Sequence, residues 1–243
     1  MDTVLKVNNM TKLYRNGRGV KNITLEIGRG DVVGLLGPNG SGKTTTMKVI
    51  VGLCHADTGS VEIFGNDVER AYEKASEKFG CLIESPALYE YLSAHQNLKY
   101  AARCYKGVSE AEIDHVLKAV RLDGYKKERA GRFSLGMKQR LGLALALLSS
   151  PELVILDEPA NGLDIEGMIE VREIITTLAG RGVTFLISSH LASEIEKTCN
   201  KVAVMHEGEM ISFDSMEDAL RYTPTLEDYY LEKVREKRGT TII

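Results

Sequence analysis

A glycine-rich segment near the N-terminus has residue types suited to holding phosphate groups. Residues 37–45 read GPNGSGKTT and contain the pattern G-x-x-x-x-G-K-[ST]. Glycines allow backbone N–H groups to turn toward phosphate oxygens without an intervening side chain. Lys43 is suited to reach the terminal phosphates, and the Thr44 hydroxyl can ligate Mg²⁺. The residues that we expect to contact a nucleotide here are Gly37, Pro38, Asn39, Gly40, Ser41, Gly42, Lys43, Thr44 and Thr45.

Two acidic residues close an apolar run later in the chain. Residues 152–157 read ELVILD, and Glu158 follows directly. Asp157 is suited to the coordination shell of Mg²⁺, and Glu158 to orienting or deprotonating an attacking water. An Asp-Glu pair at the end of a strand is unremarkable alone. A phosphate-binding loop in the same predicted sheet makes the pair a candidate catalytic centre.

Three further positions have a structural interpretation beside a functional one. Ser134, in FSLGMKQR, fits a helix N-cap with Gly136 one turn in, which a plain capped helix also explains. His190 ends the apolar run VTFLISSH, where a single histidine is more often structural. Glu84 ends the apolar run of residues 81–83, ahead of Ser-Pro, and taken alone it simply faces water at the end of a strand.

The elements expected to position these residues alternate between strands and helices, as in an α/β unit. Short β-type runs precede and follow a helix from Lys43 to about Gly52. Residues 152–157 and 183–188 predict strands buried on both faces of a parallel sheet. A helix from about 165 to 180 joins these two strands, and VAVMHEGEMISF has the pattern of a hairpin that turns at Glu207-Gly208.

The middle of the chain has a different character. From about residue 87 to 150 it is rich in Ala, Leu, Lys and Glu with helical spacing, which predicts an all-helical insert in a sheet-based core. We expect the α/β domain to cover residues 1–215 and a C-terminal helical tail to cover 216–243.

Composition restricts the class of protein. Of 243 residues, 43% are apolar and 27% charged, as in an ordinary globular protein, and the net charge of -3 gives no pull toward nucleic acid. The longest strongly apolar segment, LGLALALL, is too short to cross a bilayer. The first residues lack the layout of a signal peptide, and four scattered cysteines suggest a reducing compartment. We therefore expect a cytoplasmic protein whose membrane role comes through a partner.

Taken in order, GPNGSGKTT, FSLGMKQ, LVILDE, NGLD and His190 resemble the nucleotide-binding subunit of ABC transporters. The resemblance implies an α/β fold: a P-loop NTPase (RecA-like) core with an antiparallel β subdomain and an inserted α-helical subdomain. It also implies ATP and Mg²⁺ as cofactors. By resemblance, Tyr14 stacks on adenine, although a half-buried aromatic residue at a strand edge is the alternative.

The same resemblance implies a second copy of the chain. Ser134 and Gly136 would contact the γ-phosphate held by the opposite subunit in a head-to-tail dimer. Asp164 would lie at that interface, and His190 would sense the γ-phosphate. The signature departs from the usual L-S-G-G-Q of the family at Leu135 and Met137 but retains the two residues that face the phosphate.

Glu84 is the second departure, because family members normally have glutamine at this position. Glutamate keeps an oxygen ligand for a hard cation, adds a negative charge and loses the amide donors. We therefore expect Glu84 to act at the catalytic and metal site.

Glu84 together with SLGMKQR resembles the ATPases of bacitracin and lantibiotic resistance exporters. That resemblance implies separate transmembrane permease chains, which would hold this subunit at the inner face of the membrane. Tyr89, Leu92 and Leu98 are candidates for a groove that receives the permease, and an alternative makes them core residues.

Other functions fit less well. Soluble ABC ATPases that act on nucleic acid or ribosomes generally have two cassettes or long insertions, which this chain lacks, so we expect no nucleic-acid partner. A non-catalytic switch would be expected to lose Glu158 or His190, and both are present. An exporter of a drug, lipid, polysaccharide or ion stays open, because the cassette does not touch the cargo.

Overall fold

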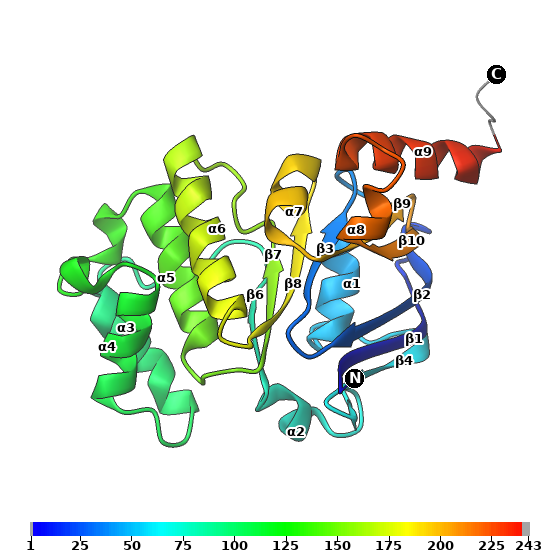
Figure 1. Cartoon of the computed structure of the whole chain (residues 1–243). Coiled ribbons are helices and arrows are strands. Elements are labelled where there is room, and N and C mark those ends of the chain that lie inside the picture. Colours follow the sequence, from blue (N-terminus) through cyan, green and yellow to red (C-terminus); the bar gives the residue numbers. More distant parts are fainter. Residues whose placement is uncertain (1, 240–243) are drawn as a thin grey trace.

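Residues 2–239 are described by the computed structural model, in which two β-sheets pack with helices around them (Figure 1). The first sheet is antiparallel, in the order β2–β1–β4–β5. In β2 the alternate residues Ile23, Leu25 and Ile27 are buried, as expected for a strand with one face against a core. The strands are β1 (Thr3–Leu13), β2 (Gly19–Gly28), β4 (Thr58–Ile63) and β5 (Asn66–Asp67).

The second sheet has the strand order β10–β9–β3–β8–β7–β6. Its strands are β3 (Val32–Leu36), β6 (Phe79–Leu82), β7 (Leu153–Asp157), β8 (Thr184–Ser189), β9 (Lys201–His206) and β10 (Glu209–Ser215). All neighbours are parallel except β9 and β10, which form the predicted hairpin, so that prediction is confirmed. Strands β3, β7 and β8 are buried along their whole length because both faces of the sheet are covered.

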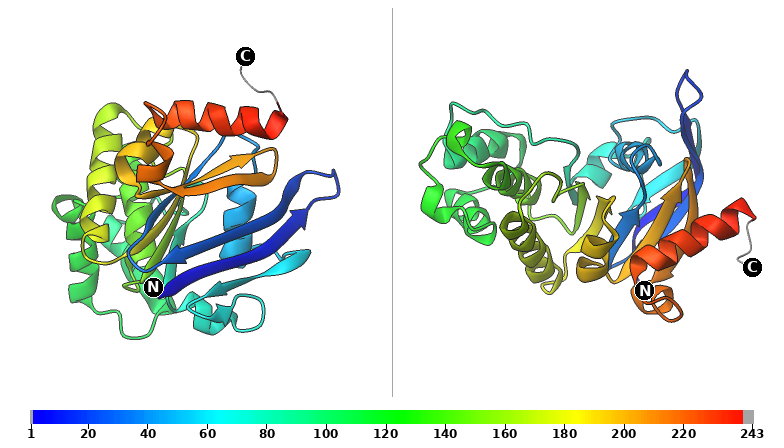
Figure 2. Two further views of the ribbon diagram at one scale, coloured as in Figure 1. Left: turned by 45° about the vertical axis from the view of Figure 1, so that its right-hand side comes forward. Right: turned by 90° about the horizontal axis from the view of Figure 1, so that it is seen from above.

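The two faces of the second sheet belong to different hydrophobic cores. Val33 and Leu35 of β3 point toward the antiparallel sheet and the helix that follows the phosphate loop. Val32 and Leu36 point to the opposite face, which the remaining larger helices cover. This layering is visible in Figure 2 and agrees with the predicted fold class, which is confirmed.

Most of the helices gather in three places: between the two sheets, on the side of the molecule away from the antiparallel sheet, and against β9 and β10 (Figures 1 and 2). They are α1 (Lys43–Ile50), α2 (Tyr72–Ser76), α3 (Ala94–Ala101), α4 (Glu110–Ala119), α5 (Leu135–Leu147), α6 (Ile165–Ala179), α7 (Ala192–Thr198), α8 (Met216–Ala219) and α9 (Leu226–Arg238). Helices α3 and α4 start with capping boxes at Ser93 and Ser109. Within residues 2–239, no helix combines the length and apolar character needed to span a membrane.

The parallel register brings three loops to one edge of the second sheet. Leu36 pairs with Ser189, and Asp157 pairs with Ser188, so β3, β7 and β8 end side by side. The chain leaves these strands as the phosphate loop, as Glu158 and as His190. Residues more than 100 positions apart in sequence therefore meet at the same edge.

Candidate active site

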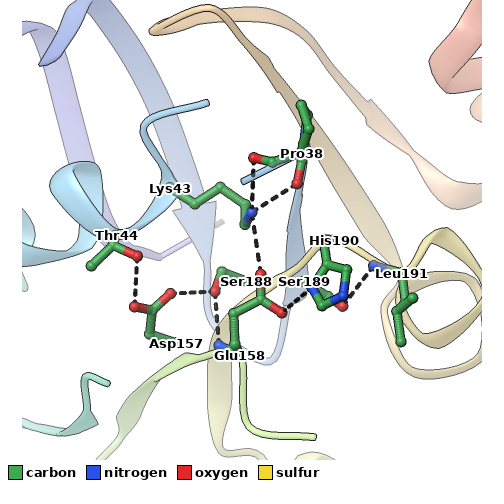
Figure 3. A network of polar contacts seen from close by, with 10 residues as sticks. Pro38, Lys43, Thr44, Asp157, Glu158, Ser188, Ser189, His190 and Leu191 are labelled. Carbon is green, nitrogen blue, oxygen red and sulfur yellow. Dashed lines mark hydrogen bonds and ion pairs between the residues drawn. The ribbon is translucent and has the colours of Figure 1, made fainter. Parts of the chain in front are cut away.

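The side chain of Lys43 points toward the backbone of the phosphate loop at Pro38 (Figure 3). This side chain is only 5% exposed, and its Nζ donates to the carbonyl oxygen of Gly37 at 2.7 Å and of Pro38 at 3.3 Å. A buried ammonium group needs such acceptors, because an unpaired charge is costly away from water. The loop thus holds a positive charge against two backbone carbonyl groups, which phosphate oxygens can replace.

Two glycines make this loop possible. A Cβ on Gly37 would lie 2.4 Å from the carbonyl oxygen of Met205 and 2.6 Å from Ser41 Oγ, so a side chain does not fit there. Gly42, the residue before α1, has φ 104°, a conformation that other residues rarely adopt. Ser41 Oγ is buried without a hydrogen-bond partner, which leaves a donor free for a bound anion.

Asp157 lies between two hydroxyl groups. Thr44 Oγ1 donates to its Oδ2 at 2.8 Å, and Ser188 Oγ donates to its Oδ1 at 2.5 Å. Ser188 Oγ also accepts from the backbone N–H of Glu158 at 2.9 Å. One buried serine therefore orients the carboxylate of Asp157 and the backbone of Glu158 together.

Glu158 joins the lysine to the histidine. Its Oε1 lies 3.2 Å from Lys43 Nζ, and its Oε2 lies 2.8 Å from His190 Nδ1 (Figure 3). Glu158 has φ 50°, a left-handed conformation that costs a residue other than glycine about 1–3 kcal/mol. Such strain is characteristic of functional sites, and here it turns the carboxylate toward the phosphate loop. A carboxylate held in this way can accept a proton from water.

Glu84 lies outside this network. Its side chain is 64% exposed, its φ is 63°, and its Oε1 accepts a hydrogen bond from Lys48 Nζ at 2.6 Å. The bond with Glu84 is the main cause that raises the pKa of Lys48. Glu84 nevertheless lines a cavity of about 360 Å³ together with Asp157 and Glu158. Among residues 2–239, no cluster of three His, Cys, Asp or Glu side chains is arranged to hold a metal, so its metal role stays a prediction.

Ser134 and Asp164 both begin helices. Ser134 Oγ accepts from the N–H of Met137 at 3.2 Å at the start of α5, and Asp164 Oδ1 accepts from the N–H of Gly167 at 2.8 Å at the start of α6. Gly136 lies beside this second cap, because a Cβ there would be 4.0 Å from the Cα of Gly167. These residues are on the surface and make no contact with the Lys43 network of their own chain.

Tyr14 follows β1 and is half exposed, with its hydroxyl 3.9 Å from Cys54 Sγ. It does not touch the polar network, and its adenine role stays a prediction.

The three predicted groove residues differ in burial. Leu98 is 0% exposed and lies in the core under α3 and α4, so the groove interpretation was wrong for this residue. Leu92 is half buried. Tyr89 is 41% exposed and packs edge-on against Tyr91 and Tyr100, at ring-centroid distances of 6.0 Å and 5.0 Å. Leu98 is buried because it lies on the inner face of an amphipathic helix.

Two residues of this region were not found from the sequence. Ser188 is one of two serines before His190, and only its position at the end of a buried strand could have indicated it. Lys48 lies five residues after Lys43, but nothing in the sequence connects it with Glu84.

Comparisons with known proteins agree with this geometry. The family model described as ABC transporter matches residues 20–161. The bacitracin transport ATP-binding protein BcrA of Bacillus licheniformis is 42% identical over 212 residues, which cover 87% of this chain and 69% of that protein. The lantibiotic transport ATP-binding protein SrtF of Streptococcus pyogenes is 42% identical over 208 residues, 86% of this chain and 89% of that protein. A solved structure described as the ATP-binding subunit of an ABC transporter superposes with a TM-score of 0.84 at 30% identity, covering 95% of this chain and 99% of that one.

Proposed function

The chain belongs to the ABC transporter family as an ATP-binding, ATP-hydrolysing subunit, and on this premise we propose that it powers the export of antimicrobial peptides. The names of two relatives, which are described as bacitracin and lantibiotic transport proteins, support this class of cargo. The catalytic part of the proposal rests on one connected network of contacts. It runs from Thr44 to Asp157 and through Ser188 to the backbone of Glu158. The carboxylate of Glu158 then contacts both Lys43 and His190.

Mg²⁺ is the metal that fits this site. The Thr44 hydroxyl and the Asp157 carboxylate are hard oxygen donors that already lie 2.8 Å apart, and Mg²⁺ is typically held by one or two such groups together with phosphate. The same two residues would hold it here, and Glu84, which lines the same cavity as Asp157, would offer a further carboxylate oxygen. Bound with ATP, the ion would neutralise negative charge on the phosphates.

Glu158 acts as the base in this proposal. The buried ammonium of Lys43 lies between the loop carbonyls and Glu158, so the lysine can move its contacts to the terminal phosphates of ATP. His190 holds the second carboxylate oxygen of Glu158 and thereby fixes its direction. Glu158 would then orient a water molecule and take its proton as the water attacks the γ-phosphorus, while the bond from this phosphorus to the bridging oxygen breaks and ADP leaves.

A second copy of the chain completes the site. Ser134, Gly136 and Asp164 are exposed or partly exposed, and Ser134 and Asp164 bond to the first turns of their own helices rather than to Lys43. In a head-to-tail dimer, the N-terminus of α5 of one copy would face the phosphates bound by the other, and a helix N-terminus favours an anion there. ATP would then bind at the contact between the two subunits.

The permease would bind near Tyr89. Three exposed tyrosines lie together on this side, where Tyr89 packs edge-on against Tyr91 and Tyr100, after the loop that contains Glu84. Aromatic residues of this kind are typical anchors of protein interfaces. A permease helix docked there would lie close in sequence to the loop that contains Glu84, so a movement of this loop could reach the permease. The same contact would hold the subunit at the inner face of the membrane.

Resistance of living cells tests the proposed cargo. The chain would be expressed with the permease genes adjacent to its own in a sensitive bacterium, and the inhibitory concentrations of bacitracin and of several lantibiotics measured. We expect them to rise with the natural chain and not with Glu158→Gln. Unchanged inhibitory concentrations for every peptide, in cells where the complex assembles and hydrolyses ATP, would instead favour another cargo such as a drug, lipid, polysaccharide or ion.

A further inference from the structure

An ion pair joins the helix after the phosphate loop to the loop that contains Glu84. Lys48, on α1, donates from Nζ to Glu84 Oε1 at 2.6 Å, across 36 positions of sequence. The two side chains are 30% and 64% exposed, so neither is locked by burial. Such a contact can open and close without disturbing the core.

Glu84 has two places in which its carboxylate can be satisfied. In this structure it accepts from Lys48, and it also lines the cavity that it shares with Asp157 and Glu158, whose lining does not include Lys48. The loop is anchored two residues later, where Pro86 packs so closely on α5 that a Cβ on Gly142 would lie 2.6 Å from Pro86 Cβ. The packing of Pro86 on α5 keeps Glu84 near the cavity, while the exposed side chain of Glu84 can change its hydrogen-bond partner.

Lys48 is well placed to be one of these partners. Its ammonium group carries a positive charge, and its Nζ lies 2.6 Å from Oε1 of the Glu84 carboxylate. A glutamine at position 84 would carry no charge to pair with it.

We propose that Lys48 is a positioning residue that holds the Glu84 carboxylate out of the Mg²⁺ site until Mg²⁺ and nucleotide bind, so that the ammonium and the metal compete for one carboxylate. The idea rests on the proposed function, in which Glu84 approaches Mg²⁺. It also explains how a glutamate is tolerated beside Asp157 and Glu158, because the additional negative charge is neutralised by Lys48 whenever the metal is absent.

Binding of a nucleotide analogue at varied Mg²⁺ tests this competition. The probe is a ribose-labelled fluorescent ATP analogue that cannot be hydrolysed, titrated at a series of Mg²⁺ concentrations and with a chelator in place of Mg²⁺. The variants are Lys48→Met, Lys48→Arg, Glu84→Gln and the double variant. Lys126→Met is the matched control, since it removes another exposed pair, with Asp114 at 2.9 Å, in the helical insert.

We expect Lys48→Met to lower the half-saturating Mg²⁺ concentration by about twofold to fivefold, the range that an exposed ion pair supports. Lys48→Arg should restore the natural value, and binding measured with the chelator should stay unchanged in both Lys48 variants and in Lys126→Met. Glu84→Gln should raise the Mg²⁺ requirement, and Lys48→Met should add nothing in that background. Hydrogen exchange of residues 83–92 without nucleotide should become equally faster in Lys48→Met and Glu84→Gln, but not in Lys126→Met.

Two results would overturn the idea in different ways. A normal Mg²⁺ requirement in Glu84→Gln would remove the metal role of Glu84 and this proposal with it. The second result assumes that Glu84→Gln does shift the Mg²⁺ requirement. If Lys48→Met then has the same Mg²⁺ requirement as Lys126→Met, or changes the requirement equally in the natural and Glu84→Gln backgrounds, only the competition by Lys48 is refuted.

Discussion

Ser188 offers the most discriminating substitution in the site. Its side chain is fully buried at the end of β8, where one oxygen donates to Asp157 Oδ1 and accepts from the N–H of Glu158. Ser188→Ala removes both contacts while changing the volume of the side chain little. The neighbouring Ser189 provides a control, because its Oγ accepts a single hydrogen bond, from the N–H of Leu191 at 3.0 Å.

The expected magnitude follows from these contacts. A hydrogen bond to an ionised group contributes about 1.5–3 kcal/mol, and a buried N–H left without an acceptor costs about 1–3 kcal/mol. The two losses overlap because one oxygen atom makes both contacts. We therefore expect Ser188→Ala to lower the free energy of unfolding by about 2–4 kcal/mol, and Ser189→Ala by about 1 kcal/mol.

Urea unfolding measures this difference, and ATP hydrolysis at varied Mg²⁺ measures its consequence. Because Ser188 orients Asp157 and the backbone of Glu158, Ser188→Ala should reduce kcat about tenfold or more and raise the Mg²⁺ requirement. Equal losses of stability in the two serine variants, with an unchanged Mg²⁺ requirement in Ser188→Ala, would refute the positioning role of Ser188.

Substitutions at Leu98 and Ser134, each paired with a second variant, test the core and the proposed subunit contact. Leu98→Ala should lower the free energy of unfolding by about 2–5 kcal/mol because Leu98 is fully buried. Tyr89→Ala, at the surface, should lower it by about 1 kcal/mol or less. Equal losses of stability for the two variants in urea unfolding would contradict the burial argument. Ser134→Ala should cost about 1 kcal/mol as a lost N-cap and should abolish ATP hydrolysis. An equimolar mixture of Ser134→Ala with Lys43→Ala should recover part of the activity, since one site then has both residues, and no recovery would argue against a site shared between chains.

Local patterns in the sequence were sufficient for much of the fold and the phosphate loop. The run before Gly37 is buried on both faces, and Gly42 has a backbone that only glycine adopts easily, so residue type and structure correspond directly. The acids at the end of β7 were predictable for the same reason. A buried apolar strand that ends in charge puts that charge at the edge of the sheet.

Contacts between distant segments could not be predicted in the same way. The hydrogen bonds of Ser188 depend on the register between β7 and β8, and the pair of Lys48 with Glu84 depends on how α1 packs beside the loop after β6. Leu98 could not be assigned for a related reason. The spacing of apolar residues identifies the apolar face of a helix, but it does not say whether that face packs against the protein's own core or binds a partner. The left-handed backbone of Glu158 is equally invisible, because glutamate has no preference for that conformation.

The most direct test of the central claim is the mass of Glu158→Gln in solution, measured by light scattering with and without ATP and Mg²⁺. Removing the base while keeping the size of the side chain should leave nucleotide binding intact and stop turnover. We predict a monomer without nucleotide and a stable dimer with ATP and Mg²⁺, accompanied by little hydrolysis. A protein that stays monomeric under both conditions, or that hydrolyses ATP at the natural rate, would contradict the account.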